Sequence, residues 1–256
     1  MKYADYIQQV EIDGLWNGRK HIMWTLDRSV NILSGVNGVG KTTILKKVTG
    51  VLSEKKLPGV KLDFSPEDAT GIRYAVIQKF TVEPDEILES LEQKYMALPE
   101  EKKVAFYDIV DNLFSATDKV ILRSERGIRL MQEGDILTFR QLSSGEKQML
   151  LILLTVLLQD SLPYVLFMDE PEVSLHMEWQ KSLIDNILRL NPNIQIILTT
   201  HSPAIIMNGW VDKVTEVNDI EGRTRTGMVS RRILSAVRLP IPPHRRIKHP
   251  RVNNLI

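Results

Sequence analysis

The chain contains no cysteine among its 256 residues, and its acidic and basic side chains nearly cancel, which leaves a net charge of +1. The lack of cysteine excludes disulfides, a cysteine nucleophile and zinc sites with thiolate ligands, and it suits a cytoplasmic protein. The near-zero net charge excludes a chain that is basic throughout, so any surface for nucleic acid has to be local.

Long apolar segments are also missing. The longest run, Met149–Leu158, has ten residues with Thr155 inside it, whereas a helix that crosses a bilayer needs about 20. The N-terminus has neither an apolar core nor a small-residue cleavage site, which argues against a signal peptide. We therefore expect no membrane association, and we interpret this run as a helix that is buried on both faces.

Strands and helices alternate along most of the chain. Strands are expected at 7–12, 21–26, 30–34, 72–78, 164–168, 194–199 and 211–217, and helices at about 41–52, 145–159 and 177–190. A turn at Asn17-Gly18 joins the first two strands, and a short helix follows Pro203. This order predicts an α/β fold with a mostly parallel sheet, helices on both faces and antiparallel strands at the N-terminus.

Three segments depart from this alternation. Residues 54–70 are polar, contain two prolines and a glycine, and are interpreted as a loop. Residues 83–122 have apolar side chains at helical spacing, interrupted by Pro99, which predicts two helices in a small helical lobe. Residues 119–139 are expected to form a hairpin with turns at glycines.

The C-terminal segment, residues 222–256, has nine lysines and arginines, four prolines and no acid. Three interpretations stay open: an extension that only a partner orders, a contact with the phosphates of a nucleic acid, or ordinary packing on the domain. The predicted organisation is one domain over residues 1–221, with the helical lobe inserted at about 83–122, followed by this basic extension.

A glycine-rich segment, Gly35–Thr42, lies between an expected strand and an expected helix. Glycines let the backbone wrap around a phosphate with its N–H groups pointing inward, and the helix adds the positive end of its dipole. Lys41 can reach the terminal phosphates, and Thr42 offers a hydroxyl to Mg²⁺. The segment predicts a nucleotide phosphate site, and a glycine turn with a chance lysine is the alternative.

Two acids and a histidine follow apolar strands that end at the same edge of the predicted sheet. Asp169 and Glu170 follow one strand, and His201 follows the next strand. We expect Asp169 in the Mg²⁺ shell and Glu170 as the general base toward the attacking water. The His201 imidazole can hydrogen-bond the γ-phosphate or hold that water. Each of these residues, taken alone, is more often structural.

A serine-rich segment, Leu142–Glu146, precedes the long apolar helix. At a helix N-terminus, the backbone N–H groups and the free hydroxyls of Ser143 and Ser144 would form a second anion site. The alternative interpretation is an ordinary helix cap, with Ser144 as the N-cap residue.

These motifs, in this order, resemble the ATP-binding cassette (ABC) ATPase domain from about residue 10 to residue 217. The segment Pro171–His176, which reads Pro-Glu-Val-Ser-Leu-His, is similar to the soluble branch of that family, with its OLD, RecF and SMC-like groups and many phage-defence ATPases. The span between Gln78 and the serine-rich segment is short and broken by a proline, so we expect no long coiled-coil arm.

The resemblance implies a P-loop fold that binds ATP and Mg²⁺ and pairs head-to-tail as a homodimer, with both nucleotides at the interface. It implies catalytic roles for Glu170, His201 and Lys41. The implied nucleotide contacts are Asn37, Gly38, Gly40, Lys41, Thr42, Thr43, Ser143, Ser144 and Gly145, and the implied metal ligands are Thr42, Gln78 and Asp169. Trp16 lies about where transporters keep a base-stacking aromatic, although a core or surface tryptophan is an equal alternative. His176 is expected to make a local structural contact.

The function that the resemblance favours is an ATPase that switches a separate effector protein, such as a nuclease, a toxin or a DNA-processing subunit, in a setting such as anti-phage defence. One alternative is the nucleotide-binding subunit of a transporter. Another is an ATP-binding scaffold or sensor that hydrolyses negligibly and sequesters a toxin.

Overall fold

A five-stranded parallel sheet forms the centre of the computed structural model, which describes residues 2–18, 20–53, 57–78, 84–123 and 127–222. Its strand order is β11-β3-β10-β9-β5, and every neighbouring pair is parallel. The strands are β3 (Val30–Ser34), β5 (Tyr74–Ile77), β9 (Tyr164–Asp169), β10 (Ile194–Thr199) and β11 (Val214–Glu216). The predicted α/β fold with a mostly parallel sheet is therefore confirmed.

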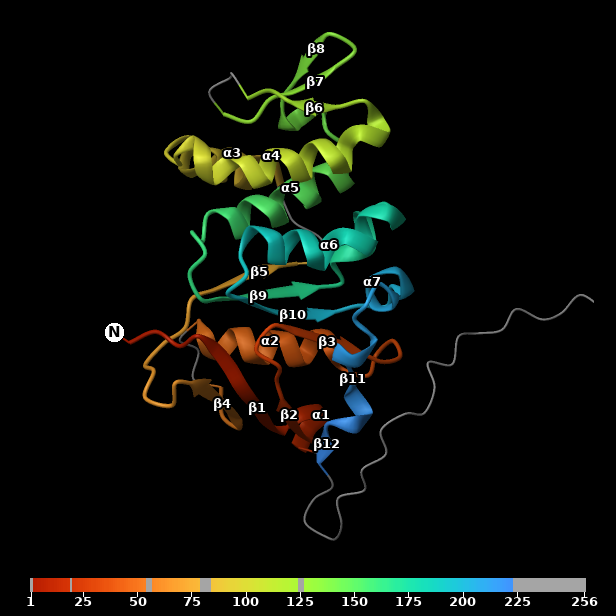
Figure 1. Ribbon diagram of the computed structural model, residues 1–256. Coiled ribbons are helices and arrows are strands. Elements are labelled where there is room, and N and C mark those ends of the chain that lie inside the picture. The colour runs from red at the N-terminus through yellow and green to blue at the C-terminus, as the bar shows by residue number, and fades with distance from the viewer. Residues whose placement is uncertain (1, 19, 54–56, 79–83, 124–126, 223–256) are drawn as a thin grey trace, which may run out of the picture. The chain divides into compact units, whose positions relative to one another are not determined.

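Helices cover both faces of this sheet, and others lie beyond them. These helices are α2 (Lys41–Leu52), α3 (Pro84–Met96), α4 (Glu100–Phe114), α5 (Ser144–Leu157), α6 (Met177–Leu190) and α7 (Pro203–Met207). In Figure 1, α3 and α4 lie on the far side of α5 from the sheet. Figure 1 shows α5 and α6 on one side of β9 and β10, and α2 on the other side. The two helices predicted on either side of Pro99 are α3 and α4. Nearly all side chains of α5 are buried, as its long apolar run predicts.

Side chains of the central strands alternate between two hydrophobic cores. Ile196 and Leu198 of β10 pack in the core that contains side chains of α3, α4, α5 and α6. Ile197 lies between them in the chain and packs in the other core, with Ile44 and Leu45 of α2. Because both faces are buried, the central strands are mostly apolar, which is typical of a covered parallel sheet.

An antiparallel sheet of order β12-β2-β1-β4 carries the N-terminal strands. Its elements are β1 (Tyr6–Gly14), α1 (Leu15–Gly18), β2 (Lys20–Thr25), β4 (Val60–Ser65) and β12 (Glu221–Gly222). The prediction of a loop over 54–70 was wrong, because β4 pairs with β1 along nearly its whole length. Val60, Leu62 and Phe64 pack against the core, and this period of two was obscured by the flanking proline and glycine.

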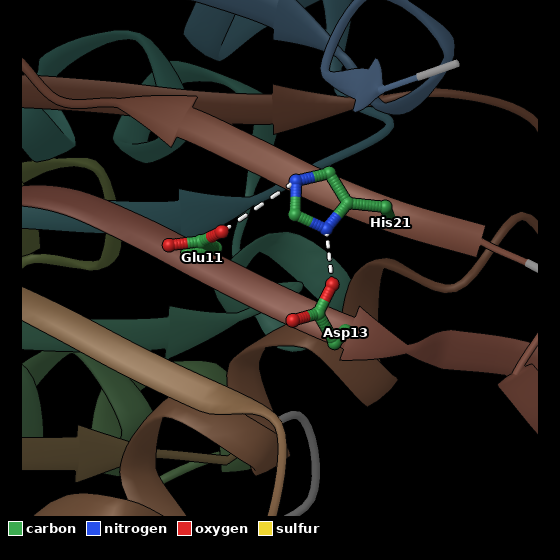
Figure 2. A group of neighbouring side chains, drawn as sticks. All are labelled: Glu11, Asp13 and His21. Atoms are coloured by element: carbon green, nitrogen blue, oxygen red, sulfur yellow. Dashed lines mark hydrogen bonds and ion pairs between the residues drawn. The ribbon is translucent and has the colours of Figure 1, made fainter. Parts of the chain in front are cut away.

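A cluster of two acids and a histidine joins β1 to β2. Figure 2 shows the His21 imidazole between Glu11 and Asp13. The Nδ1 atom faces Asp13, and the Nε2 atom lies 3.7 Å from Glu11 Oε1. The residue types suit a metal, but the two ring nitrogens face different carboxylates. We therefore interpret the cluster as an ion-pair network between the strands.

A small sheet of order β6-β7-β8 follows α4. Its strands are β6 (Val120–Ile121), β7 (Leu130–Gln132) and β8 (Asp135–Leu137), so the segment predicted as a hairpin has three strands. Short 3-10 helices complete the fold: η1 (Ser115–Thr117), η2 (Phe139–Gln141), η3 (Pro171–Ser174), η4 (Val211–Lys213) and η5 (Val217–Asp219). Beyond Gly222, the predicted extension lies outside the described residues. Among the described helices, none has both the length and the apolar character that a membrane crossing requires.

Candidate nucleotide site

The glycine-rich segment connects β3 to the first residue of α2, as the sequence predicts. Gly38 and Gly40 have φ values of 80° and 110°, a region that side chains disfavour, so glycine is required at both turns. Gly40 is the residue immediately before α2. The first N–H groups of this 12-residue helix therefore lie beside the loop, where an anion is favoured. Asn37 is exposed in the loop, and Thr43 is half-buried in the first turn of the helix.

The Lys41 side chain folds back over this loop and is nearly buried. Its Nζ donates to the carbonyl oxygen of Gly35 at 2.8 Å and lies 2.6 Å from Nε2 of His201. A lysine ammonium has only donors, so Nε2 of His201 has to be the accepting nitrogen in this contact. The structure thus brings together two of the three predicted catalytic residues, which are 160 positions apart in the chain.

The predicted metal ligands line one cavity of about 370 Å³, together with Glu170. Thr42 Oγ1 donates to both carboxylate oxygens of Asp169, at 2.9 and 3.1 Å. Thr199, a residue that the sequence analysis did not single out, donates to Asp169 Oδ1 at 2.7 Å and orients the carboxylate. The exposed Gln78, just after β5, also lines this cavity. A hydroxyl, a carboxylate and an amide oxygen are hard ligands, so these residues fit Mg²⁺.

Glu170 adopts a backbone conformation with φ 45°, which is uncommon for a residue with a side chain. Its N–H donates to the carbonyl oxygen of Thr199 at 3.1 Å, which ties the end of β9 to β10. Its carboxylate is mostly buried and lies 3.9 Å from His201 Nε2. Glu170 lines the 370 Å³ cavity and also a second cavity of about 670 Å³, which His201 shares.

The serine-rich segment caps α5. Ser143 is the N-cap residue, so the alternative that named Ser144 as the cap was wrong. Its hydroxyl accepts from the Glu146 N–H at 3.3 Å and donates to Glu146 Oε2 at 2.9 Å. The expectation that this hydroxyl is free was therefore wrong. Lys119 pairs with Glu146 Oε1 at 2.9 Å. Burial alone would raise the pKa of Glu146, but hydrogen bonds from Ser143 and the Lys119 ammonium hold it below its ordinary value.

Gly145 lets this segment pack directly against η3. A Cβ atom at this position would lie 2.4 Å from the carbonyl oxygen of Ser174, which is far inside contact distance. Ser143 and Ser144 are exposed at the helix end. Helices α5 and α2 contribute to different cores on opposite faces of the sheet. Among the described residues that line the Thr42 cavity, none is Ser143, Ser144 or Gly145.

Trp16 and His176 are the two remaining residues for which the sequence suggested a contact. Trp16 is exposed, and its ring lies beside Gly40, where an added Cβ would meet it at 3.3 Å. His176 caps α6 by accepting from the Glu178 N–H at 3.4 Å, so the expected structural contact is confirmed.

A strand, a glycine loop and a helix, with an acid pair after β9 and a histidine after β10 at the same sheet edge, define a P-loop ATPase with an ABC-like core. The family described as "AAA domain, putative AbiEii toxin, Type IV TA system" matches residues 54–208, more than half of the chain, and the chain belongs to this family. The resemblance to phage-defence ATPases of the ABC type is therefore confirmed.

Two curated relatives and two solved structures add to this assignment. An uncharacterized ABC transporter ATP-binding protein of Bacillus subtilis (strain 168), YvrA, is 33% identical over 172 residues, which cover 61% of this chain and 34% of that protein. The Retron Vc95 probable ATPase of Vibrio cholerae serotype O1 biovar El Tor is 27% identical over 105 residues, 37% of this chain and 20% of that protein. The chain thus spans about a third and a fifth of these relatives.

Two of the similar solved structures are SMC heads. The SMC head domain from Thermotoga maritima superposes with a TM-score of 0.54 at 15% identity, over 84% of this chain and 94% of that one. An SMC head bound to the C-winged helix domain of ScpA gives 0.53 at 14% identity, over 79% and 92%. At these identities the likeness shows the shared fold, which is that of ABC-like ATPase heads.

Proposed function

We propose that this chain hydrolyses Mg-ATP in a head-to-tail homodimer and that the cycle switches a separate effector protein. The observation that carries the proposal is the cavity where Thr42, Gln78, Asp169 and Glu170 meet beside the glycine loop. Three hard oxygen ligands and an adjacent buried carboxylate, placed next to a phosphate-binding loop, are what ATP hydrolysis requires of a protein.

Each side chain has a distinct task in this proposal. Lys41 leaves its contacts with Gly35 and His201 and pairs with the β- and γ-phosphates. Thr42, Gln78 and Asp169 hold Mg²⁺, which shields the phosphate charge when bound. Glu170 accepts the proton of the attacking water at its carboxylate. Once Lys41 releases His201, the Nε2 atom can carry a proton and donate to that water or to the γ-phosphate.

The second half of each nucleotide site comes from the other subunit. Ser143 and Ser144 are exposed at the N-terminus of α5 and do not line the cavity of their own chain. The end of a 14-residue helix attracts an anion. A second copy in head-to-tail orientation would place this helix end on the γ-phosphate held by the first copy. The exposed Trp16, beside Gly40, would stack on the adenine.

The effector is a separate chain in this proposal, and its class is a nuclease, a toxin or a DNA-processing subunit. The family description and the similarity to a retron ATPase support a defence setting. The basic segment 222–256 is proposed as an extension of the ATPase domain, with nucleic acid as one of its possible contacts. A transporter subunit is the second candidate, because one relative carries that name. Purification of the chain together with the products of neighbouring genes separates these two candidates. A soluble effector should co-purify in the first case, and a membrane protein in the second.

Steady-state turnover tests the hydrolytic part. Glu170→Gln removes the base while keeping the size of the side chain, so kcat should fall by about 10²–10⁴ while ATP binding persists. Glu178→Gln, an exposed change in the first turn of α6, serves as the control and should leave turnover unchanged. Wild-type turnover in Glu170→Gln would remove this residue from the base role. Negligible turnover in the unchanged protein would favour the scaffold or sensor.

A further inference from the structure

Glu172 connects η3 to the loop that carries His201. Its Oε1 atom accepts two hydrogen bonds, from the hydroxyl of Thr200 at 2.7 Å and from the N–H of His201 at 2.8 Å. Glu172 belongs to the segment Pro171–His176, and no role was predicted for it from the sequence. The contact links the glutamate after the Asp-Glu-Pro sequence to Thr200, 28 residues later in the Thr-Thr-His sequence.

The bonds of Glu172 are part of a wider network that fixes this loop. Thr200 is fully buried, and its hydroxyl also accepts from the N–H of Ser202 at 2.9 Å. Ser202 in turn donates to Gln180 Oε1 at 2.5 Å, and the amide of Gln180 donates to the Leu175 carbonyl oxygen at 2.8 Å. The main chain on either side of His201 is therefore held by η3 and by α6.

This anchoring decides where the imidazole lies. The ring nitrogen Nε2 is 2.6 Å from Lys41 Nζ and 3.9 Å from Glu170 Oε1, so a small shift of the loop would break one contact or the other. Glu172 bonds the N–H of His201 itself, one bond from its Cα atom. No other described side chain accepts from this N–H. Glu172 therefore fixes the main chain at His201 directly, and with it the start of the His201 side chain.

Glu172 also faces the 670 Å³ cavity that Glu170 and His201 line. Its Oε2 atom is buried and has no partner among the described residues, so only half of the carboxylate is used locally. Val173 and Met177, which follow in the chain, are exposed apolar side chains on the lining of that cavity.

We propose that Glu172 is a positioning residue that couples the position of η3 to His201. The inference rests on the proposed function, in which His201 acts at the γ-phosphate. The two hydrogen bonds of Glu172 tie η3 to the main chain of His201, so the position of the imidazole depends on the position of η3.

Kinetics of three variants test the coupling. Glu172→Ala removes the acceptor, so kcat should fall about 10- to 100-fold with little change in KM, because the ring is displaced while the phosphate loop is intact. Glu172→Gln keeps an oxygen that can accept both bonds, so it should recover kcat to within about threefold of the unchanged protein. Glu178→Gln, an exposed acid six residues away, controls for charge and should change neither constant.

A double change shows whether Glu172 acts through His201. Glu172→Ala combined with His201→Ala should be no slower than His201→Ala alone, because the positioned group is then gone. The proposal would be overturned if the two losses in kcat multiply in the double variant. It would also be overturned if Glu172→Gln is as slow as Glu172→Ala. Thermal melting of each variant shows that the chain is folded. If Glu172→Ala does not fold, the glutamine variant and its pairing with His201→Ala decide.

Histidine NMR separates this inference from the proposed function. The ring signals of His201, assigned by their loss in His201→Ala, should shift in Glu172→Ala and not in Glu178→Gln, in nucleotide-free protein. If the unchanged protein does not hydrolyse ATP but the His201 signals shift in Glu172→Ala, the proposed hydrolysis is refuted and the positioning role stands. Unshifted His201 signals in Glu172→Ala would refute the positioning role, whatever the turnover.

Discussion

Replacing Lys119 with methionine should destabilise the protein strongly, because it leaves the carboxylate of Glu146 buried without its cation. The two groups are 2.9 Å apart, and their side chains are only 11% and 4% exposed. Removing one partner of a buried ion pair costs about 3–5 kcal/mol. Glu146 keeps its two bonds from Ser143, so we expect the lower end, about 3 kcal/mol. For a chain of this size, Tm should fall by roughly 6–12 °C.

Lys181→Met is the matched control. Lys181 pairs with Glu178 at 2.7 Å, but these side chains are 46% and 65% exposed. An exposed pair of this kind contributes at most about 1 kcal/mol. Urea unfolding followed by circular dichroism at pH 7 gives both free energies of unfolding. A loss in Lys119→Met no larger than the loss in Lys181→Met would refute the reasoning about burial.

The loss should also depend on pH in a defined direction. The pKa of Glu146 is lowered in the folded protein: burial opposes this, and the Ser143 hydrogen bonds and Lys119 outweigh it. The stability that a lowered carboxyl pKa provides is present above the unfolded pKa of about 4.3 and is lost as pH falls through the folded pKa. The difference between Lys119→Met and the unchanged protein should therefore shrink below about pH 4. A constant difference would contradict the assignment to this pair.

Three further predictions concern the site. Lys41→Ala should abolish nucleotide binding, measured by equilibrium fluorescence with an ATP analogue, and retained tight binding would refute the phosphate-loop assignment. Gly145→Ala should cost about 1–3 kcal/mol in urea unfolding, because its Cβ meets a backbone oxygen at 2.4 Å, whereas Ser144→Ala on the exposed side should be nearly neutral. Ser143→Arg should spare ATP binding and block ATP-dependent dimerisation in light scattering; Ser143→Ala, which loses only the cap, about 1 kcal/mol, should still dimerise.

Much of the fold could be predicted because local patterns carry it. The strands at 164–168 and 194–199 are mostly apolar, and Pro99 separates two amphipathic helices, so each element is apparent from its own residues. The phosphate loop is equally local, since glycines and a lysine at fixed spacing define its backbone. Strand β4 was missed because its alternating residues are few and lie among a proline and a glycine.

The contacts within the site could not be predicted in the same way. Ser143 was expected to be free, but Glu146 engages its hydroxyl, and the partner that makes a charged Glu146 tolerable is Lys119, 27 positions earlier. Glu172 and Thr199 act on residues of other strands, so their roles depend on how β9 and β10 lie side by side. The predictions for Asp169, Glu170 and His201 remain predictions of role, although the fold places all three at one edge.

The central claim is that each nucleotide is held by the glycine loop of one copy and the serine-bearing helix end of another. Mixing two inactive variants tests it most directly. Lys41→Ala has lost the phosphate-binding lysine but keeps an intact helix end with Ser143. Ser143→Arg has lost that helix end but keeps an intact glycine loop. A mixed dimer therefore contains one complete site, made of the loop of one variant and the helix end of the other. We predict that turnover, negligible in either variant alone, appears on mixing in proportion to the mixed dimer. A mixture as inactive as its components, with both variants folded and mixed dimers present, would contradict the account.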